Sequence, residues 1–318
     1  MRRALLALVA AVACGCSTPT EAPPPSARAD DGARIVSLEQ RSDRMLDLTV
    51  DSPAVGRRVP VRLLLPAGFD GAPGRRWPVL YLLHGCCDDY RSWTEQTDVE
   101  ELTAPSDVLV VMPDGGAVGF YSDWLRGPAW ETFHLVEMRQ LLERGYRAGP
   151  QRAIAGLSMG GLGAIAYAAR HPGVFRAAAS FSGLLNTRTT YGGGPRGHQF
   201  RLIEGEGEDP LALWGDPDQQ AAVWAAHNPH DLAPRLRGTT LFVSTGNGDP
   251  GPLDPPGSTA DDAEQLTHAE TAEFVDRLRA LRIPATADLY GPGTHTWPYW
   301  QRGLHRSWPL LSRALGIG

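Results

Sequence analysis

The sequence predicts a single α/β domain in which a mainly parallel central sheet carries helices on both faces. Residues 77–83 and 108–113 are continuous apolar runs, which are typical of strands buried on both faces of a sheet. Residues 130–144 and 264–281 instead place apolar side chains at helical spacing. Strand-like and helix-like segments alternate through most of the chain without an interrupting linker, so residues 34–318 are expected to form one domain.

The composition is that of a globular protein with a sizeable core, since 42% of the 318 residues are hydrophobic and 21% are charged. The formal net charge is −6, and all 30 basic residues are arginine because the sequence contains no lysine. An acidic chain without a basic tract argues against nucleic acid as a partner. The acidic, proline-rich stretch 249–262 lacks the spacing of a compact metal-binding loop, and we expect neither a metal nor another cofactor.

The N-terminus has the pattern of an export signal. Two arginines precede an apolar stretch over residues 4–13 that is too short to span a bilayer, and Cys16 follows a small residue, as in bacterial lipoprotein signals. We therefore expect residues 1–16 to be a signal peptide with a lipidated Cys16, and plain secretion is the alternative. Residues 17–33, rich in proline, serine, threonine and alanine, are expected to be a disordered tether. The protein would be secreted or lipid-anchored to the outer face of the cell membrane.

The folded part is expected to begin with two antiparallel strands. Residues 35–50 and 57–65 alternate apolar and polar side chains, and a turn at Ser52-Pro53 joins them. Residues 183–231 show no periodicity, and a long irregular insertion of this kind is usually a lid or a binding loop. The other expected elements are helices over 98–102 and 297–315 and strands over 177–181, 239–245 and 286–290.

The motif that organises the chain is Gly156-Leu157-Ser158-Met159-Gly160. An apolar run over 153–155 enters it and a small-residue segment over 162–169 leaves it, which predicts a sharp strand-to-helix turn with Ser158 at its apex. Glycines at this spacing let the backbone take a strained turn. The following helix directs its free N–H groups back at the serine, where negative charge would develop during acyl transfer. Ser158 is therefore the predicted nucleophile.

A serine nucleophile needs a base, a carboxylate that orients the base, and donors for the oxyanion. His295 is the predicted base because it follows the last strand in a glycine-rich loop, and the carboxyl ends of parallel strands gather ligands. Position alone leaves three carboxylates open, with Asp249 favoured over Asp254 and Glu264. The other histidines after Ser158 are weaker candidates for the base: His171, His198, His227, His230, His268 and His305.

The oxyanion donors are predicted to be two backbone N–H groups. One belongs to Met159, directly after the nucleophile, and the other to Cys86, in the turn that follows the strand at 77–83. Cys86 and Cys87 are adjacent, so they form no ordinary disulfide framework and are expected to be either thiols or a strained disulfide. A thiol nucleophile at Cys86 is a weaker alternative to Ser158.

Beyond this motif, the sequence resembles the antigen 85 mycolyltransferases and the wider esterase D family from about residue 60 to the C-terminus. The resemblance implies an α/β-hydrolase fold and acyl-ester chemistry on extracytoplasmic substrates. The matching segments follow the family's order and similar spacing: Val110-Val111-Met112-Pro113, Gly115-Gly116, Phe120-Tyr121-Ser122-Asp123-Trp124, Trp130-Glu131-Thr132-Phe133, Gly156-Leu157-Ser158-Met159, Trp214-Gly215, Asn228-Pro229, Gly246-Asn247-Gly248 and residues 293–300.

The resemblance changes the predicted acid from Asp249 to Glu264. In those mycolyltransferases the acid is a glutamate about one helix before the histidine segment, and Glu264 precedes His295 by 31 positions (295 − 264). Three residues in or beside the family-like segments are predicted to contact the substrate: His84, Trp124 and Trp297.

One departure from the family bears on the reaction. The turn His84-Gly85-Cys86-Cys87 stands where the mycolyltransferases have Asp-Gly-Leu-Arg, and the arginine tied to sugar and acyl-donor binding has no counterpart. The predicted function is therefore an extracytoplasmic serine carboxylester hydrolase with Ser158, His295 and Glu264 as its triad. Acyl transfer to a sugar or glycolipid of the cell envelope is the alternative, and a catalytically inactive binding module is a third.

Overall fold

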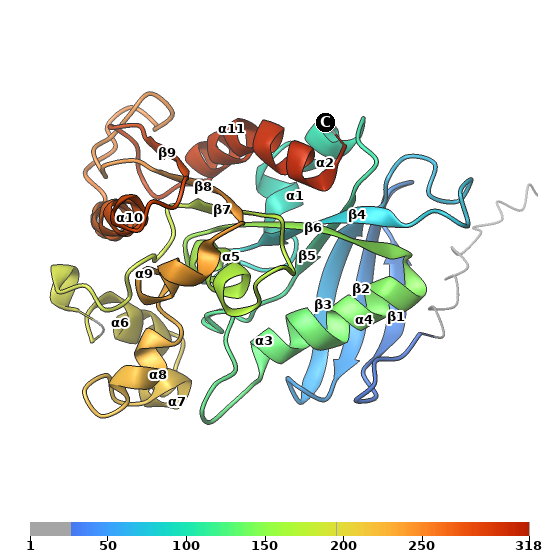
Figure 1. Cartoon of the computed structure of the whole chain (residues 1–318), viewed down its shortest axis with the longest axis horizontal. Coiled ribbons are helices and arrows are strands. Elements are labelled where there is room, and N and C mark those ends of the chain that lie inside the picture. Colours follow the sequence, from blue (N-terminus) through green and yellow to red (C-terminus); the bar gives the residue numbers. More distant parts are fainter. Residues whose placement is uncertain (1–26, 195, 318) are drawn as a thin grey trace, which may run out of the picture.

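The computed structural model describes residues 27–194 and 196–317 and contains one nine-stranded sheet (Figure 1). The strands lie side by side in the order β1-β2-β3-β5-β4-β6-β7-β8-β9. Their bounds are Arg34–Gln40, Met45–Ser52, Arg57–Leu64, Trp77–Leu83, Leu109–Pro113, Ala148–Leu157, Ala177–Phe181, Thr240–Thr245 and Thr286–Leu289, from β1 to β9. The strands from β4 to β9 run parallel, which confirms the predicted mainly parallel sheet.

Helices cover both faces of the sheet, as predicted. Successive side chains of the buried strand β4 enter two separate cores, with Tyr81 in one and Leu82 in the other. One core includes side chains from α4 (Arg139–Gly145), α5 (Met159–Arg170) and α10 (Asp262–Ala280). The other includes side chains from α1 (Ser92–Gln96), α2 (Val99–Thr103) and α11 (Trp297–Leu315).

The part of the sheet formed by the first strands of the chain is antiparallel and contains three strands where two were predicted. β1, β2 and β3 pair in chain order, and β3 then pairs antiparallel with β5. The single strand predicted over 35–50 is wrong, because the polar residues 41–44 form a turn in which the Arg41 N–H donates to the Met45 carbonyl at 2.8 Å.

The predicted long helices are present with small shifts at their ends. The helix predicted over 130–144 runs from α3 (Trp130–Thr132) through a π-helical segment, η1 (Phe133–Met138), into α4. The helices predicted over 98–102, 264–281 and 297–315 correspond to α2, α10 and α11.

The insertion over residues 183–231 is not irregular, which corrects the prediction. Its short helices lie together at the lower left of Figure 1. Trp214 and Trp224 are buried and meet edge to face, with ring centroids 5.0 Å apart, and both belong to the core that includes side chains from α5 and α10. These helices are η2 (Tyr191–Gly193), α6 (His198–Gly205), α7 (Pro210–Trp214), α8 (Ala221–Ala225) and α9 (Pro229–Leu232), and η3 (Ala233–Leu236) follows them.

The ordered body begins earlier than predicted. Arg28 and Arg34 form an isolated antiparallel bridge, and Ala33 between them is fully buried. The predicted disordered tether is therefore wrong over residues 27–33, because these residues pack against the domain.

The predicted signal peptide, residues 1–16 with Cys16, lies outside the described residues, as does the tether over 17–26. Within the described part of the chain, no helix combines the length and the apolar character needed to cross a membrane.

Candidate active site

Ser158 lies at the sharp turn between β6 and α5. Its backbone has φ +51° and ψ −120°, a conformation that costs strain for a residue with a Cβ atom. The Ser158 N–H donates to the Phe181 carbonyl at 2.9 Å, which ties the turn to the neighbouring strand β7. Gly160 is packed so closely that a Cβ atom there would lie 2.4 Å from the Leu83 carbonyl oxygen. The serine is therefore held at the carboxyl edge of the sheet by its neighbours.

His295 lies in the loop between β9 and α11 and hydrogen-bonds to Ser158. Its Nε2 lies 2.9 Å from the Ser158 Oγ, and its Nδ1 lies 2.7 Å from Glu264 Oε2. The tautomer with the proton on Nδ1 fits both contacts, because Nδ1 then donates to the carboxylate and Nε2 accepts from the serine hydroxyl. The His295 N–H also donates to Asp261 Oδ2 at 3.0 Å, which ties this loop to the start of α10.

Glu264 lies in the first turn of α10 and is fully buried. While Oε2 accepts from His295, Oε1 accepts from the Gly246 N–H at 2.6 Å and from the hydroxyls of Thr245 and Ser182, each at 2.9 Å. A carboxylate with both oxygens occupied by donors cannot rotate freely, so it fixes the plane and tautomer of the imidazole.

The other two candidate acids are bonded elsewhere. Asp249 accepts from the Asn247 side chain at 2.9 Å, and Asp254 accepts from the Tyr299 hydroxyl at 2.8 Å. Neither carboxylate hydrogen-bonds to His295 in the described structure.

Three of the histidines that were weaker candidates for the base illustrate why they do not take this role. His171 bonds to Glu131 and His305 to Asp98. His198, at the start of α6, is half-buried, and burial first and the charge of His295 second lower its pKa to about 4. His198 is therefore neutral at pH 7.

The two predicted oxyanion donors flank the serine. The Met159 N–H is the first in α5, so it has no partner within the helix. In the described residues the Cys86 N–H donates to no other backbone group, and Gly85 before it lies so near that a Cβ atom there would be 3.4 Å from the Ser158 Cβ. Both groups are available to a negatively charged oxygen above Ser158.

Cys86 and Cys87 are both free thiols, with their Sγ atoms 2.8 Å apart. Burial, followed by the contact with Cys87, raises the pKa of the Cys86 thiol well above its usual range. A protonated thiol is a poor nucleophile, and among the residues that the structure describes no base hydrogen-bonds to Cys86 as His295 does to Ser158.

Of the three residues predicted to contact the substrate, His84 is buried and the two tryptophans are partly exposed. His84 is buried, its Nδ1 donates to the Gly85 carbonyl at 2.7 Å, and its Nε2 accepts from the Gly115 N–H at 2.8 Å. This does not fit the predicted contact with a substrate; His84 instead holds the turn that carries Cys86. Trp124 and Trp297 are half-buried, and Trp297 meets Trp93 edge to face with ring centroids 5.4 Å apart.

Ser182 and Asp261 support the site but were not singled out from the sequence. Ser182 follows β7 and connects Trp300 to Glu264, since its hydroxyl accepts from the indole N–H at 3.2 Å and donates to the carboxylate. Asp261 caps α10 and also holds the His295 loop. The signal that could have identified them is their position just after a strand and at the start of a helix. Among the described residues, no group of His, Cys, Asp and Glu is arranged to hold a metal ion.

Comparison with known proteins places the chain in a family. It matches the family described as "Putative esterase" over residues 52–310. It is 33% identical over 285 residues to "Diacylglycerol acyltransferase/mycolyltransferase Ag85B" of Mycolicibacterium smegmatis, which covers 85% of each chain. It is 32% identical over 280 residues to "Esterase Rv1288" of Mycobacterium tuberculosis, which covers 84% of this chain but 59% of that protein.

Solved structures show the same fold. MPT51 (FbpC1) of Mycobacterium tuberculosis has a TM-score of 0.68 at 26% identity and covers 85% of this chain and 97% of its own. An S-formylglutathione hydrolase from Agrobacterium tumefaciens has a TM-score of 0.69 at 17% identity and covers 89% of this chain and 99% of its own. The predicted α/β-hydrolase fold is confirmed, and the chain belongs to the esterase family that includes the antigen 85 mycolyltransferases, with the activity of a serine esterase or acyltransferase.

Proposed function

We propose that this chain is an extracytoplasmic carboxylic ester hydrolase that works through Ser158, His295 and Glu264 and a covalent acyl-enzyme. The observation that carries the proposal is the hydrogen-bonded row from the Ser158 Oγ through the His295 ring to the Glu264 carboxylate, with distances of 2.9 Å and 2.7 Å. This row provides a nucleophile, a base and an orienting group in the order that serine catalysis requires.

In the first half-reaction, the Ser158 Oγ attacks the ester carbonyl carbon while His295 Nε2 takes the hydroxyl proton. The carbonyl oxygen becomes an oxyanion and accepts hydrogen bonds from the N–H groups of Cys86 and Met159. The tetrahedral intermediate collapses, the bond to the alcohol oxygen breaks, and His295 returns the proton to that oxygen. The alcohol leaves, and Ser158 carries the acyl group.

In the second half-reaction, a water molecule gives a proton to His295 and attacks the acyl carbon. The second tetrahedral intermediate then releases the carboxylic acid and restores the Ser158 hydroxyl. Glu264 stabilises the imidazolium that forms in each half-reaction and does not itself take the proton.

Acyl transfer to a sugar or glycolipid is the alternative outcome of the same acyl-enzyme. It is favoured by the 33% identity to a protein named as an acyltransferase and mycolyltransferase. Hydrolysis is favoured by the turn at His84-Gly85-Cys86-Cys87, which departs from the Asp-Gly-Leu-Arg of the mycolyltransferases. The two outcomes differ only in whether water or an alcohol attacks the acyl carbon.

Hydrolysis of a chromogenic short-chain ester, with and without trehalose as acceptor, tests the proposal. We expect carboxylic acid as the main product in both cases, and a loss of about 10³-fold or more in kcat for Ser158→Ala. The matched control is Ser106→Ala. Ser106 lies before the N-terminal end of β5, whereas Ser158 follows the C-terminal end of β6. Ester hydrolysis that survives Ser158→Ala would refute the assignment of Ser158 as the nucleophile. Acyl-trehalose as the main product would favour acyl transfer over hydrolysis.

The extracytoplasmic location rests on the export signal in residues 1–16 and on the small residue before Cys16. Growth of an expressing bacterial host with radiolabelled palmitate tests the anchor. We expect label on the full chain and none on Cys16→Ala. Equal labelling of the two proteins, or no labelling of either, would rule out a lipid anchor on Cys16 and would favour plain secretion.

A further inference from the structure

Asp88 is a carboxylate beside the nucleophile that the proposed reaction does not use. It follows the turn at Gly85-Cys86-Cys87 and is half-buried. A Cβ atom built on Gly85 would lie 3.4 Å from Asp88 Oδ2 and also 3.4 Å from the Ser158 Cβ. The carboxylate oxygen and the serine Cβ are therefore no more than twice that distance apart, and a substrate bound at Ser158 comes within range of this charge.

Within the described part of the chain, no cationic side chain forms an ion pair with Asp88. Its carboxylate accepts one hydrogen bond there, from the Ser92 Oγ at 3.4 Å. The next residue, Asp89, forms an ion pair with Arg91 at 2.7 Å and also accepts from the Arg91 backbone N–H at 2.8 Å. Burial raises the pKa of the Asp88 carboxyl above its ordinary value, and positive charge on His84 opposes this shift. The charge of Asp88 is therefore left to act on a substrate that binds beside it.

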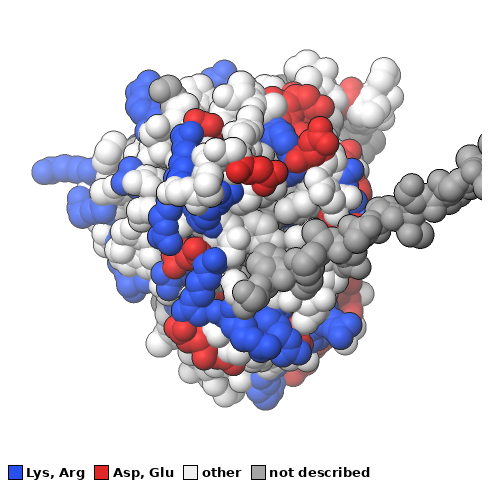
Figure 2. All heavy atoms as spheres, turned by 90° about the vertical axis from the view of Figure 1, so that its right-hand side faces the viewer, with Lys and Arg blue, Asp and Glu red and all other residues white. Residues whose placement is uncertain are grey.

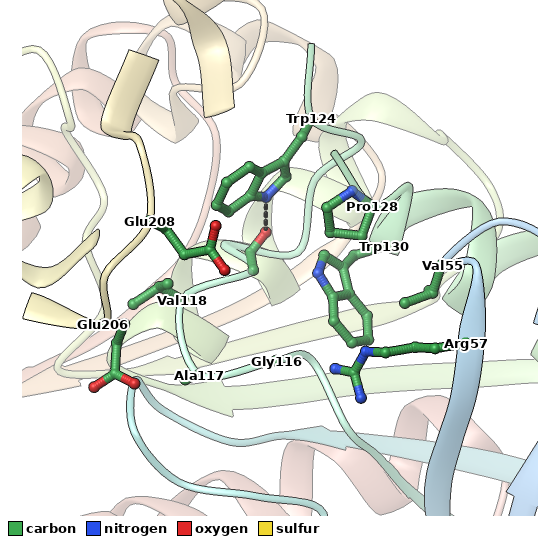
Figure 3. A pocket seen from close by; sticks show the side chains of 11 residues that line it. Val55, Arg57, Gly116, Ala117, Val118, Trp124, Pro128, Trp130, Glu206 and Glu208 are labelled. Carbon is green, nitrogen blue, oxygen red and sulfur yellow. Dashed lines mark hydrogen bonds between the residues drawn. The ribbon is translucent and has the colours of Figure 1, made fainter. Parts of the chain in front are cut away.

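A second carboxylate lies against the same turn. Glu206 Oε1 lies 3.5 Å from the Cys87 Sγ, and the Cys87 N–H donates to the Ala117 carbonyl at 3.0 Å. Figure 3 shows Glu206 beside Ala117, whereas Arg57 lies across the cavity that adjoins the turn and stacks over the Trp130 ring at 5.4 Å. The surroundings of the turn are therefore acidic on the side where Glu206 lies.

This negative charge bears on the reaction because an oxyanion forms at the turn. The proposed donor is the Cys86 N–H, and the carboxylate of Asp88, two residues later, repels a negative oxygen there. A cationic group on the substrate attracts both the oxyanion and the carboxylate, so it offsets this repulsion. An uncharged ester of the same shape has no such compensation. Of two such esters, the cationic one should therefore gain more from the site in the transition state.

We propose that Asp88 is a specificity-determining residue, which makes the site prefer esters with a cationic group beside the ester bond to uncharged esters of the same shape. The inference deepens the proposed function and rests on it, since it names a class of substrate for Ser158. The cation can belong to the alcohol, as in a choline ester, or to the acyl chain. The shared chemistry is a quaternary ammonium a few bonds from the ester, and the experiment places it in each part in turn.

Two pairs of esters measure the preference, and the members of each pair differ in charge but hardly in shape. The first pair is butyrylcholine and its tert-butyl analogue, and the second is the phenyl ester of trimethylammoniobutyrate and its tert-butyl analogue. For each pair, the kcat/KM of the cationic ester is divided by that of the neutral ester. We expect Asp88→Asn to lower at least one of these ratios about threefold to tenfold, the effect of removing one half-buried charge near a second charge. A fall in one ratio alone assigns the cation to the alcohol or to the acyl chain.

Each ratio comes from one preparation, so a variant that folds only in part lowers both rates alike and leaves the ratio unchanged. Asp107→Asn is the matched control, because it removes the same charge from an exposed ion pair with Arg75 that lies before β5. It should leave both ratios as they are in the wild type. Ratios that Asp88→Asn leaves unchanged, or lowers no more than Asp107→Asn does, would overturn the inference.

Hydrolysis of none of these esters by the wild type would refute the proposed function and leave the role of Asp88 to a binding measurement. In that case, calorimetric titration of Ser158→Ala with butyrylcholine decides the inference alone. Binding should weaken about threefold to tenfold when Asp88→Asn is added. No binding of butyrylcholine, or binding that the second substitution leaves unchanged, would contradict a charge preference set by Asp88.

Discussion

Glu264 lies on α10 and is connected to Ser158 through the ring of His295. Oε2 accepts from His295, and Oε1 accepts from Ser182, Thr245 and Gly246, so the carboxylate has one orientation. A glutamate in the first turn of a helix also gains from the helix dipole, which favours negative charge there. At the scale of single residues, the site therefore depends on the charge of Glu264 as well as its shape.

We predict that Glu264→Gln lowers kcat for ester hydrolysis by about 10³–10⁴-fold, since an amide cannot hold the His295 tautomer or stabilise its cation. The side chain keeps its size, so the melting temperature should change little relative to the loss of rate. Asp249→Asn is the matched control, because Asp249 bonds to Asn247 and not to His295. A larger loss for Asp249→Asn than for Glu264→Gln would overturn the assignment of the acid.

The sequence was informative about single residues to different degrees. Ser158 and His295 could be singled out as candidates because a motif marks the first and a position after the last strand marks the second. Glu264 could not be separated from Asp249 without the family resemblance, because all the candidates lie in or beside one acidic loop. The contact between Ser182 and Glu264 joins residues 82 positions apart, and such pairing depends on the folded chain rather than on local pattern.

At the scale of elements, the turn between β6 and α5 requires the helix to start almost in contact with β4. Gly160 lies against the backbone oxygens of Leu83 and His84, the residues that lead into the turn with Cys86. The close approach places the free N–H of Met159 beside that turn. The packing of α5 against the end of β4 therefore also sets the geometry of the two proposed oxyanion donors.

We predict that Gly160→Ala destabilises the fold by about 3 kcal/mol or more and abolishes ester hydrolysis. The new Cβ atom would lie 2.4 Å from the Leu83 oxygen and 2.5 Å from the His84 oxygen, and the central strand cannot move away cheaply. Urea unfolding measures the first effect and the ester assay the second. Gly205→Ala is the control, because nothing lies within 4 Å of a Cβ atom there. Equal stability of the two variants would contradict this packing.

Elements with strong periodicity were predictable and short ones were not. The buried strands β4 and β5 are apolar along their whole length, and α11 has the predicted bounds. The helices within 183–231 have three to eight residues each, too few turns for a helical period to appear in the sequence. Their existence depends on tertiary contacts such as that between Trp214 and Trp224.

At the scale of the whole molecule, charges are balanced locally on the surface while a few carboxyls are buried. Figure 2 shows basic and acidic side chains beside one another on one face. Among the described residues, exposed ion pairs include Arg144 with Asp30 at 2.6 Å and Arg75 with Asp107 at 2.7 Å. Surface pairs of this kind contribute little to stability, so buried groups dominate the dependence of stability on pH.

Glu270, on α10, is 3% exposed, and burial raises its pKa from 4.5 to about 8. At a pH between these two pKa values, Glu270 has lost its proton in the unfolded chain but keeps it in the folded chain. The contribution of Glu270 to the free energy of unfolding therefore falls as pH rises. We predict that Glu270→Gln is more stable than wild type at pH 8 by a few kcal/mol and that the gain shrinks towards pH 5. Urea unfolding at several pH values measures this, with the exposed Glu204→Gln as control. A stability difference that is constant from pH 5 to pH 8 would contradict the burial of the neutral acid.

Peptide mass mapping after reaction with a fluorophosphonate tests most directly whether Ser158 forms a covalent intermediate. The hydroxyl that bonds to His295 at 2.9 Å should displace fluoride and carry the phosphonyl group. We predict one adduct per chain, on the peptide that contains Ser158, and no adduct on Ser158→Ala. An adduct on Cys86 or elsewhere, or labelling that persists in Ser158→Ala, would contradict the proposed mechanism.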